Sequence, residues 1–328
     1  MRLFAAWLIA MTALMPSLSP AGTMYLAPDV ATDLDGPTTF LPWHVVRHVS
    51  GGPVYYGQEL GLPGNPAIDA LHKLDAGGWL LSVEAPNDFA GFLAAAPEDV
   101  VQTDGNSVSA FFDGSCVTGA IPAGAGVDAV YLDGADDGDL VVSLDAPATI
   151  SGTTYMPSAL LRYTRTLAGP CGWTLVGQEI DFRDAPTTLW NPAGANVIGA
   201  DRVRGMWIVA LDVPVDLGPS AGPATYMPGQ IASFDGVTWD LFEDLPTEGS
   251  PGWPVTSQVS ALSCQANPGR IDPGVASLLL GKTGAQIEVQ CPGSCSSGAE
   301  WYGIYEGTLA SLRGGVYDHV RVVCDELC

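Results

Sequence analysis

Tandem repetition is the feature that most constrains the fold of this chain. Three segments share one pattern: a short apolar strand, a polar turn, a second apolar strand, an acid, and a proline within two residues. The segments begin at Ile68, Val127 and Ala195, so the period is about sixty residues. A repeat of this kind is one structural unit that buries its apolar face only against neighbouring copies.

A second pattern follows each of these segments and also occurs once before the first of them. Small, aromatic and apolar residues lead into a strand, a turn and another strand, with copies beginning at Thr38, Gly91, Thr153 and Ala224. Asp104-Gly105 and Asp235-Gly236 fall between the two strands, where tight hairpin turns favour such pairs. Val, Leu, Trp, Tyr and Phe dominate the strands, and Gly or Pro interrupts almost every window. Each unit is therefore predicted to contain four short strands rather than helices.

The first unit lacks its first strand. It opens on "TMYLAP", residues 23–28, which resembles the second strand of the other units. The missing strand has a counterpart in "VSALSC", residues 259–264, which no further repeat follows. A late strand that completes the first sheet closes a radial array and removes its open edge. We therefore predict an all-β fold in which residues 22–264 form a four-unit β-propeller-like array, with a pair of β-sandwiches as the alternative.

The N-terminus has the features of a secretory signal peptide. Met1-Arg2 precedes an apolar run, residues 3–15, and small residues follow it. We expect residues 1–21 to be this signal peptide. The apolar run is short for a bilayer span, and no later segment predicts a transmembrane helix. The expected location is secreted, periplasmic or at the cell surface.

The charge of the chain argues against one class of partner. It has 36 acidic and 12 basic residues and a net charge of −24. A phosphate backbone would be repelled, so nucleic-acid binding is not expected. The acids are spread along a chain that is 47% hydrophobic, which indicates a folded protein. An unknown protein or polysaccharide is the expected ligand.

Seven cysteines in an exported chain indicate disulfide bonds. Cys116 and Cys171 stand alone in the middle of the chain and form a candidate pair. The other five, from Cys264 onward, crowd the C-terminal part and mark residues 265–328 as a separate module. The odd count leaves one thiol over. A zinc site of two C-x3-C pairs, Cys291 with Cys295 and Cys324 with Cys328, is the alternative.

The repeats resemble those of exported bacterial proteins of undefined function. Ser82 and Ser143 with Asp145 match one part of that pattern, and Asp99, Val100, 111–115 and 234–239 match the other. The segments "SCSSGAEWYGIYEGTLASL" and "YDHVRVVCDE" resemble the region that follows such repeats. The resemblance implies a propeller-like fold, then a fibronectin-type-III-like β-sandwich in which Cys295 pairs with Cys324. The chain stops before that pattern ends, so we expect a truncated sandwich.

An acidic cluster lies in "LDGADDGDLVVSLDAP", residues 132–147. Asp133, Asp137 and Asp139 are candidate Ca²⁺ ligands, and no other cofactor is expected. The cluster lacks the spacing of an EF-hand loop and its closing glutamate. A polar hairpin turn is the competing interpretation and is favoured.

Another set of acids recurs from repeat to repeat. Glu84, Asp145 and Asp212 each follow the second strand of their unit. A radial arrangement would bring them around one axis, where they could bind a cation or another polar ligand. The alternative is that each caps its own turn by accepting hydrogen bonds from backbone amides.

No catalytic residue can be assigned, because nucleophile elbows, zinc-protease motifs and phosphate-binding loops are absent from the sequence. His44 and His48 are expected on a strand, half exposed and too far apart for one metal ion. We predict a non-enzymatic binding or surface-associated protein. The alternative is a secreted carbohydrate-active hydrolase with carboxylates at the propeller mouth. Aromatic residues are expected to pack between the sheets: Tyr55, Tyr56, Trp79, Trp173, Trp207 and Trp239.

Overall fold

A computed structural model gives the fold. The residues that it describes are 23–35, 38–49, 55–60, 62–75, 77–89, 94–134, 138–185, 188–203, 205–218, 225–246, 253–254, 257–265, 279–283, 286–290, 304–306 and 320–323. The chain divides into two units, Met1–Asn267 and Pro268–Cys328. In the described ranges we find no helix with the length and apolar character needed to cross a membrane.

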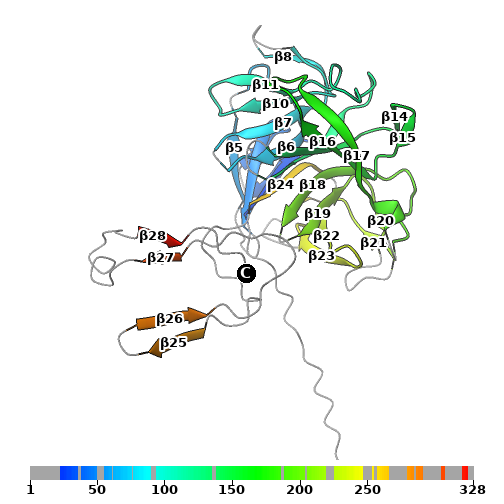
Figure 1. Ribbon diagram of the computed structural model, residues 1–328. Coiled ribbons are helices and arrows are strands. Elements are labelled where there is room, and N and C mark those ends of the chain that lie inside the picture. Colours follow the sequence, from blue (N-terminus) through cyan, green and yellow to red (C-terminus); the bar gives the residue numbers. More distant parts are fainter. Residues whose placement is uncertain are drawn as a thin grey trace, which may run out of the picture. The chain divides into compact units, whose positions relative to one another are not determined.

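The first unit consists of four sheets, which we call blades, each of four antiparallel strands (Figure 1). Blade 1 is β24 (Val259–Gln265), β1 (Thr23–Pro28), β4 (His44–Val49) and β5 (Tyr55–Glu59). Blade 2 is β6 (Ile68–Lys73), β7 (Trp79–Val83), β10 (Val100–Thr103) and β11 (Val108–Phe112). Blade 3 is β12 (Val127–Asp133), β13 (Asp139–Leu144), β16 (Ala159–Arg165) and β17 (Trp173–Asp181). Blade 4 is β18 (Val197–Val203), β19 (Met206–Leu211), β22 (Gln230–Phe234) and β23 (Trp239–Asp244). The predicted four-unit propeller is confirmed.

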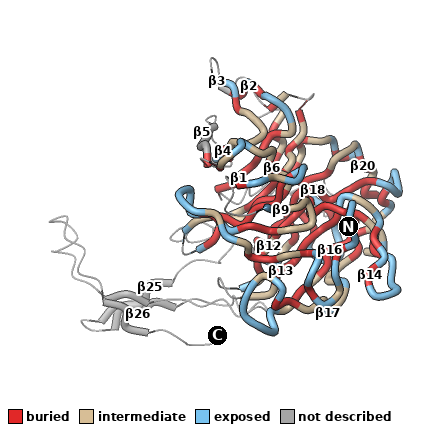
Figure 2. The backbone as a smooth tube through the Cα atoms, turned by 90° about the horizontal axis from the view of Figure 1, so that it is seen from above, coloured by how far each residue is buried: buried red, intermediate tan, exposed pale blue. Residues whose placement is uncertain are grey.

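The first strand of each blade lies at the centre of the array. These inner strands, β24, β6, β12 and β18, pack against one another around a common axis and are mostly buried (Figure 2). Their third residues are all small: Ala261, Ala70, Ala129 and Gly199. A Cβ atom at Gly199 would lie 2.6 Å from the Cβ of Leu262 on β24. Small residues are therefore what allows four strands to meet at the axis.

The predicted closure is also confirmed. β24 pairs antiparallel with β1, so that Leu262 is opposite Leu26 and Cys264 is opposite Met24. The last inner strand thus completes the first blade. This pairing gives β1 a partner on each side, β24 and β4, so β1 is not an open sheet edge.

Serine hydroxyls join neighbouring blades. Ser82 Oγ of β7 donates to the carbonyl oxygen of Val127 on blade 3, at 2.7 Å. Ser143 Oγ of β13 donates in the same way to Val197 O on blade 4, at 2.7 Å. These are the serines of the repeat pattern, and they satisfy buried carbonyl groups at the start of the next inner strand.

Each blade has an additional two-stranded hairpin that the sequence pattern did not predict. It is inserted between the second and third strands, which is where the recurring proline stands. The four hairpins are β2 (Thr32–Asp35) with β3 (Thr38–Phe40), β8 (Asn87–Asp88) with β9 (Ala94–Ala95), β14 (Ala148–Ile150) with β15 (Thr153–Tyr155), and β20 (Val215–Asp216) with β21 (Thr225–Tyr226). Their strands are too short to show an alternating pattern.

The predicted turns form as expected. Asp104 Oδ1 accepts hydrogen bonds from the amides of Asn106 and Ser107, both at 2.8 Å, between β10 and β11. Asp235 accepts from the amides of Val237 and Thr238 between β22 and β23. Four of the tryptophans predicted to pack between sheets are buried: Trp79, Trp173, Trp207 and Trp239. The side chains of Tyr55 and Tyr56 lie outside the described residues.

The candidate disulfide is confirmed. Cys116, which follows β11, is bonded to Cys171, which precedes β17. The bridge therefore links blade 2 to blade 3. Cys264 is not in a disulfide.

Of the second unit the structure describes two hairpins, β25 (Leu279–Thr283) with β26 (Gln286–Gln290) and β27 (Ile304–Glu306) with β28 (Val320–Val323). Its four cysteines lie outside the described residues. The pairing of Cys295 with Cys324, the zinc alternative and the fibronectin-like sandwich therefore stay predictions.

Candidate functional site

The recurring acids first have a local structural role. Asp145 Oδ1 accepts a 2.8 Å hydrogen bond from the amide of Gly126, just before β12. Asp212 Oδ1 accepts from the amide of Asn196, just before β18, at the same distance. In blade 1, Asp29 Oδ1 accepts the equivalent hydrogen bond from the amide of Gln258, just before β24. The acid thus ties the end of the second strand to the start of the inner strand. It accepts from a backbone amide, as the capping alternative has it, but the amide lies 16 or 19 residues away rather than in the acid's own turn.

Two further aspartates lie on the inner strands at this end of the axis. Asp69 and Asp128 are the second residues of β6 and β12, each at the irregularity where the pairing register shifts. Their carboxyl groups form a hydrogen bond with each other across the boundary between blades 2 and 3. Sequence reasoning missed them, although "IDALHKL" and "VDAVYLD" carry an aspartate at the same repeat position.

The surroundings favour the protonated form of both carboxyl groups. Burial raises the pKa of Asp128 well above its usual range, and the neighbouring Asp69 carboxyl raises it further. Burial raises the pKa of Asp69 as well, and the charges of Glu84 and Asp145 add to this effect. Two adjacent carboxylates in a medium of low polarity cannot both ionise without an opposite charge.

Asn196 completes the cluster. Its side-chain Nδ2 donates to Asp128 Oδ2. The side chain is 7% exposed, and its Oδ1 has no hydrogen-bond partner among the described residues. We call Asp69, Asp128 and Asn196, with Glu84 and Asp145 beside them, the axial mouth.

The structure thus brings two of the three predicted acids to one site. Glu84 and Asp145 both act electrostatically on Asp69. Asp212 contacts the cluster through Asn196, whose backbone amide donates to its carboxylate. Burial raises the pKa of Asp212. Whether these acids bind a ligand stays a prediction.

The axial mouth gathers negative charge. The groups that most shift the pKa values of Asp69 and Asp128 are Glu84, Asp145, the two members of the pair themselves and Asn196. Glu84 and Asp145 are exposed. The site can therefore attract a positive charge from solution and offer it oxygen atoms.

At the opposite end of the axis, polar groups of three blades surround one carboxylate. Asp201 Oδ2 of β18 accepts from Ser263 Oγ at 3.0 Å and from the amide of Cys264. His72 Nδ1 of β6 lies 3.7 Å from the same carboxylate. This arrangement gives Asp201 partners on two other blades, so it stabilises the packing of inner strands.

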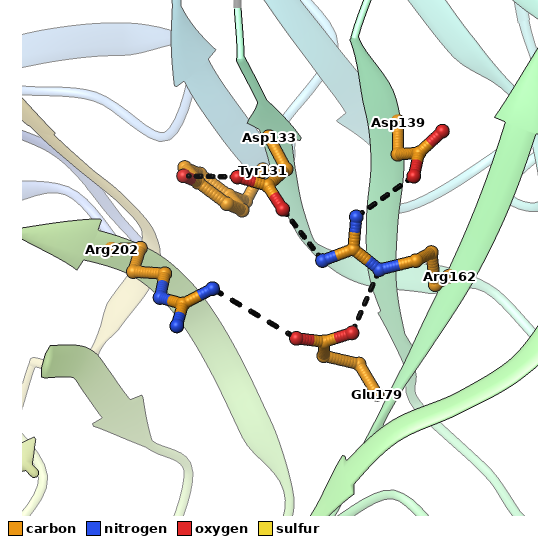
Figure 3. Close-up of polar contacts among 6 residues, drawn as sticks. All are labelled: Tyr131, Asp133, Asp139, Arg162, Glu179 and Arg202. Atoms are coloured by element: carbon orange, nitrogen blue, oxygen red, sulfur yellow. Dashed lines mark hydrogen bonds and ion pairs between the residues drawn. The ribbon is translucent and has the colours of Figure 1, made fainter. Parts of the chain in front are cut away.

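The acidic hairpin of blade 3 contains an ion-pair cluster (Figure 3). Asp133 and Asp139 are opposite one another at the ends of β12 and β13. Arg162 of β16 reaches both carboxylates, at 2.6 and 2.9 Å, and also Glu179, at 2.7 Å. These partners raise the pKa of the guanidinium. Asp137 lies outside the described residues. Calcium binding here stays a prediction, but Arg162 already supplies a positive charge to two of its three ligands.

The remaining groups that could bind a metal ion make structural contacts instead. In the described ranges, the three side chains Asp113, Cys116 and Cys171 come close enough to share an ion, but the two cysteines are bonded to each other. His44 Nδ1 accepts from the amide of Leu41. His48 lies on β4 as predicted, but it is buried rather than half exposed, 3.6 Å from Glu243 of blade 4. The reason is that blade 4 covers this strand when the array closes.

No protein-family model and no curated protein matches the chain. Among solved structures, it is 10% identical to the extracellular domain of the one-component system BT4673 from B. thetaiotaomicron, with a TM-score of 0.26, over 68% of this chain and 28% of that one. YCF48 bound to a D1 peptide gives 10% identity and a TM-score of 0.29, over 69% of this chain and 87% of that one. The chain thus spans well under two thirds of the first of these structures. Similarity this weak supports no inference about function.

Proposed function

We propose that the protein is an exported, non-enzymatic binding protein that takes a positively charged group of its ligand at the axial mouth. One observation carries this proposal. Asp128, which is buried, and the partly exposed Asp69 lie at the axis beside Glu84 and Asp145, and the groups that most shift the pKa values of this pair are acids and Asn196.

Physical chemistry favours a cationic group. Removing a carboxylate from water costs free energy unless an opposite charge or hydrogen-bond donors replace the water. The exposed Glu84 and Asp145 make the surroundings of the pair more negative, and the whole chain carries a net charge of −24. Anionic ligands would be repelled, whereas a lysine or arginine side chain of a protein partner would be attracted.

Two features support export. The N-terminal residues have the pattern of a signal peptide. The disulfide between Cys116 and Cys171 is of a kind that persists mainly in oxidising compartments. Both features fit a location in the periplasm, at the cell surface or outside the cell.

The geometry favours binding over the hydrolase alternative. Carboxyl pairs of glycosidases are about 5–10 Å apart, because water or the sugar must fit between them. Asp69 and Asp128 are closer, since they share a direct hydrogen bond. Assay of the purified protein on chromogenic glycosides separates the two functions. Turnover that is lost in Asp128→Asn would overturn the non-enzymatic assignment.

The binding proposal is tested with a peptide array in the presence of a chelator. The array contains lysine- or arginine-containing peptides, neutral peptides and acidic peptides. We expect binding of the basic peptides alone, weakened by the double substitution Glu84→Gln and Asp145→Asn. The matched control is Asp75→Asn with Asp240→Asn, which removes two exposed acids outside the axial mouth. Equal binding by both double variants, or no binding of basic peptides, would refute the proposal.

A further inference from the structure

The axial mouth has a set of oxygen atoms that no turn or ion pair accounts for. Asp69 and Asp128 come from adjacent blades at the same repeat position, and Asn196 comes from the segment that leads into β18, the inner strand of blade 4. Asn196 Nδ2 contacts Asp128, so the amide group lies against the carboxyl pair. Three inner segments therefore direct polar side chains to one place on the axis.

Asn196 gives an independent indication of a ligand. Its Oδ1 is buried and lacks a hydrogen-bond partner in the described residues, although buried amide oxygens are nearly always satisfied. An unsatisfied buried acceptor costs free energy that a bound donor or cation would recover. Its position beside two carboxyl groups makes a cation the better complement, because those groups need positive charge as well.

The chemistry of the donors indicates which cation. Carboxylate and amide oxygens are hard ligands, of the kind that Ca²⁺ and Mg²⁺ prefer. The interactions assigned to Asp69 and Asp128 include no histidine or cysteine, which zinc and copper sites usually contain. Solvent can complete the coordination shell, since Glu84 and Asp145 at the rim are exposed.

We infer that the axial mouth binds one hard divalent cation, Ca²⁺ or Mg²⁺, through the carboxylates of Asp69 and Asp128 and the Oδ1 of Asn196. Glu84 and Asp145 contribute negative charge around it. This inference rests on the proposed function, in which the axial mouth binds a positively charged group. It adds that a divalent metal ion is one such group. The site is distinct from the acidic hairpin of blade 3, where Arg162 contacts Asp133 and Asp139.

The test is calorimetric titration of the chelator-treated full chain with CaCl₂ and, separately, MgCl₂ at neutral pH, together with thermal melting. We expect one binding event per chain and a higher Tm with the preferred ion. Asp69→Asn and Asp128→Asn should each weaken binding by about tenfold or more. Asn196→Asp should tighten binding, because a carboxylate replaces the amide oxygen. Asp75→Asn, an exposed acid in the turn between β6 and β7, should bind as the unmodified protein does.

Two results would overturn the inference. One is the absence of heat and of a melting shift in the unmodified chain at millimolar Ca²⁺ and Mg²⁺. The other is binding that Asp69→Asn and Asp128→Asn leave unchanged while circular dichroism shows that both variants are folded. In either case, basic peptides that bind in chelator and depend on Glu84 and Asp145 would leave the proposed function standing. Loss of both activities would refute both.

Discussion

Ser143 and Val197 belong to adjacent blades, and the Ser143 hydroxyl donates a 2.7 Å hydrogen bond to the Val197 carbonyl oxygen. Both residues are buried. Ser82 makes the equivalent bond to Val127 one blade earlier. We expect Ser143→Ala to lower the free energy of unfolding by about 1–3 kcal/mol, because it leaves a buried carbonyl group unsatisfied.

Urea unfolding followed by tryptophan fluorescence measures this effect. Ser109→Ala is the control, because Ser109 is an exposed serine on β11. The control should change the midpoint little. Equal midpoints for Ser143→Ala and Ser109→Ala would show that the hydroxyl does not hold the two blades together.

Arg162 is predicted to stabilise blade 3 through its three acidic partners. Arg162→Met would leave Asp133, Asp139 and Glu179 near one another without their shared cation. The guanidinium is largely buried, at 18% exposure, so we expect a loss above about 1 kcal/mol, which is the usual limit for an exposed pair. Arg47→Met removes the same charge from an exposed position on β4 and should cost less. Chemical denaturation compares the two, and a similar cost for both would mean that the cluster adds no stability.

The disulfide is predicted to fasten blade 2 to blade 3. Substituting both Cys116 and Cys171 by Ser opens a loop with a sequence separation of 55 residues. Native disulfides contribute about 2–5 kcal/mol, so the melting temperature should fall markedly. Reductant should lower the melting temperature of the unmodified protein toward that of the double variant. A variant as stable as the oxidised protein would contradict this role.

The closing strand should be essential, whereas the C-terminal unit should not be. We expect a chain that ends at Asn267 to keep β24 and unfold cooperatively at the same urea concentration as the full chain. A chain that ends at Ser257 lacks β24, so β1 loses one of its two pairing partners. That chain should expose an edge and aggregate or fail to fold. Size-exclusion chromatography and urea midpoints distinguish the two, and cooperative unfolding of the shorter chain would contradict closure by β24.

Asp181 is predicted to make stability depend on pH. Burial raises the pKa of Asp181, but hydrogen bonds from Arg183 and Ser158 outweigh burial, so the net shift is downward. A folded-state pKa below the unfolded value of about 3.9 contributes stability above that pH, which is lost as the pH falls through the folded-state pKa. Asp181→Asn should therefore cost about 1–2 kcal/mol near neutrality and less in acid.

Urea midpoints measured between neutral and strongly acid pH check this prediction. Asp184→Asn alters an exposed acid three residues along the chain. Its midpoint should differ little from that of the unmodified protein at any pH. A gap between Asp181→Asn and the unmodified protein that stays constant with pH would show that the carboxylate charge is not what stabilises this segment.

The fold was largely readable from the repeats, because each blade must bury its faces against similar neighbours. The spacing of the strands, and the single strand pattern at residues 259–264 that no further repeat follows, predicted that β24 pairs with β1. The Asp-Gly turns were predictable from local geometry alone. The small hairpins between second and third strands were not, because two to four residues are too few to establish a period.

The candidate site could be predicted only in part. The repeating acids lie at the same end of the axis as Asp69 and Asp128, because an acid after the second strand lies next to the start of the inner strand. Their repetition is explained first by capping, as Asp145 and Asp212 show. Asp69 and Asp128 were less visible, since a single aspartate in a strand is common in so acidic a chain.

The sequence by itself determined the repeating strands, the closure of the ring and a candidate disulfide, because these follow from periodicity, turn chemistry and cysteine placement. Only the tertiary structure decided which acids share a site. It brings Asp69 and Asp128 together across two blades, and it places Arg162 between Asp133 and Asp139. The reason is that charge compensation depends on distances between strands far apart in sequence, and those distances exist only once the inner strands have packed around the axis.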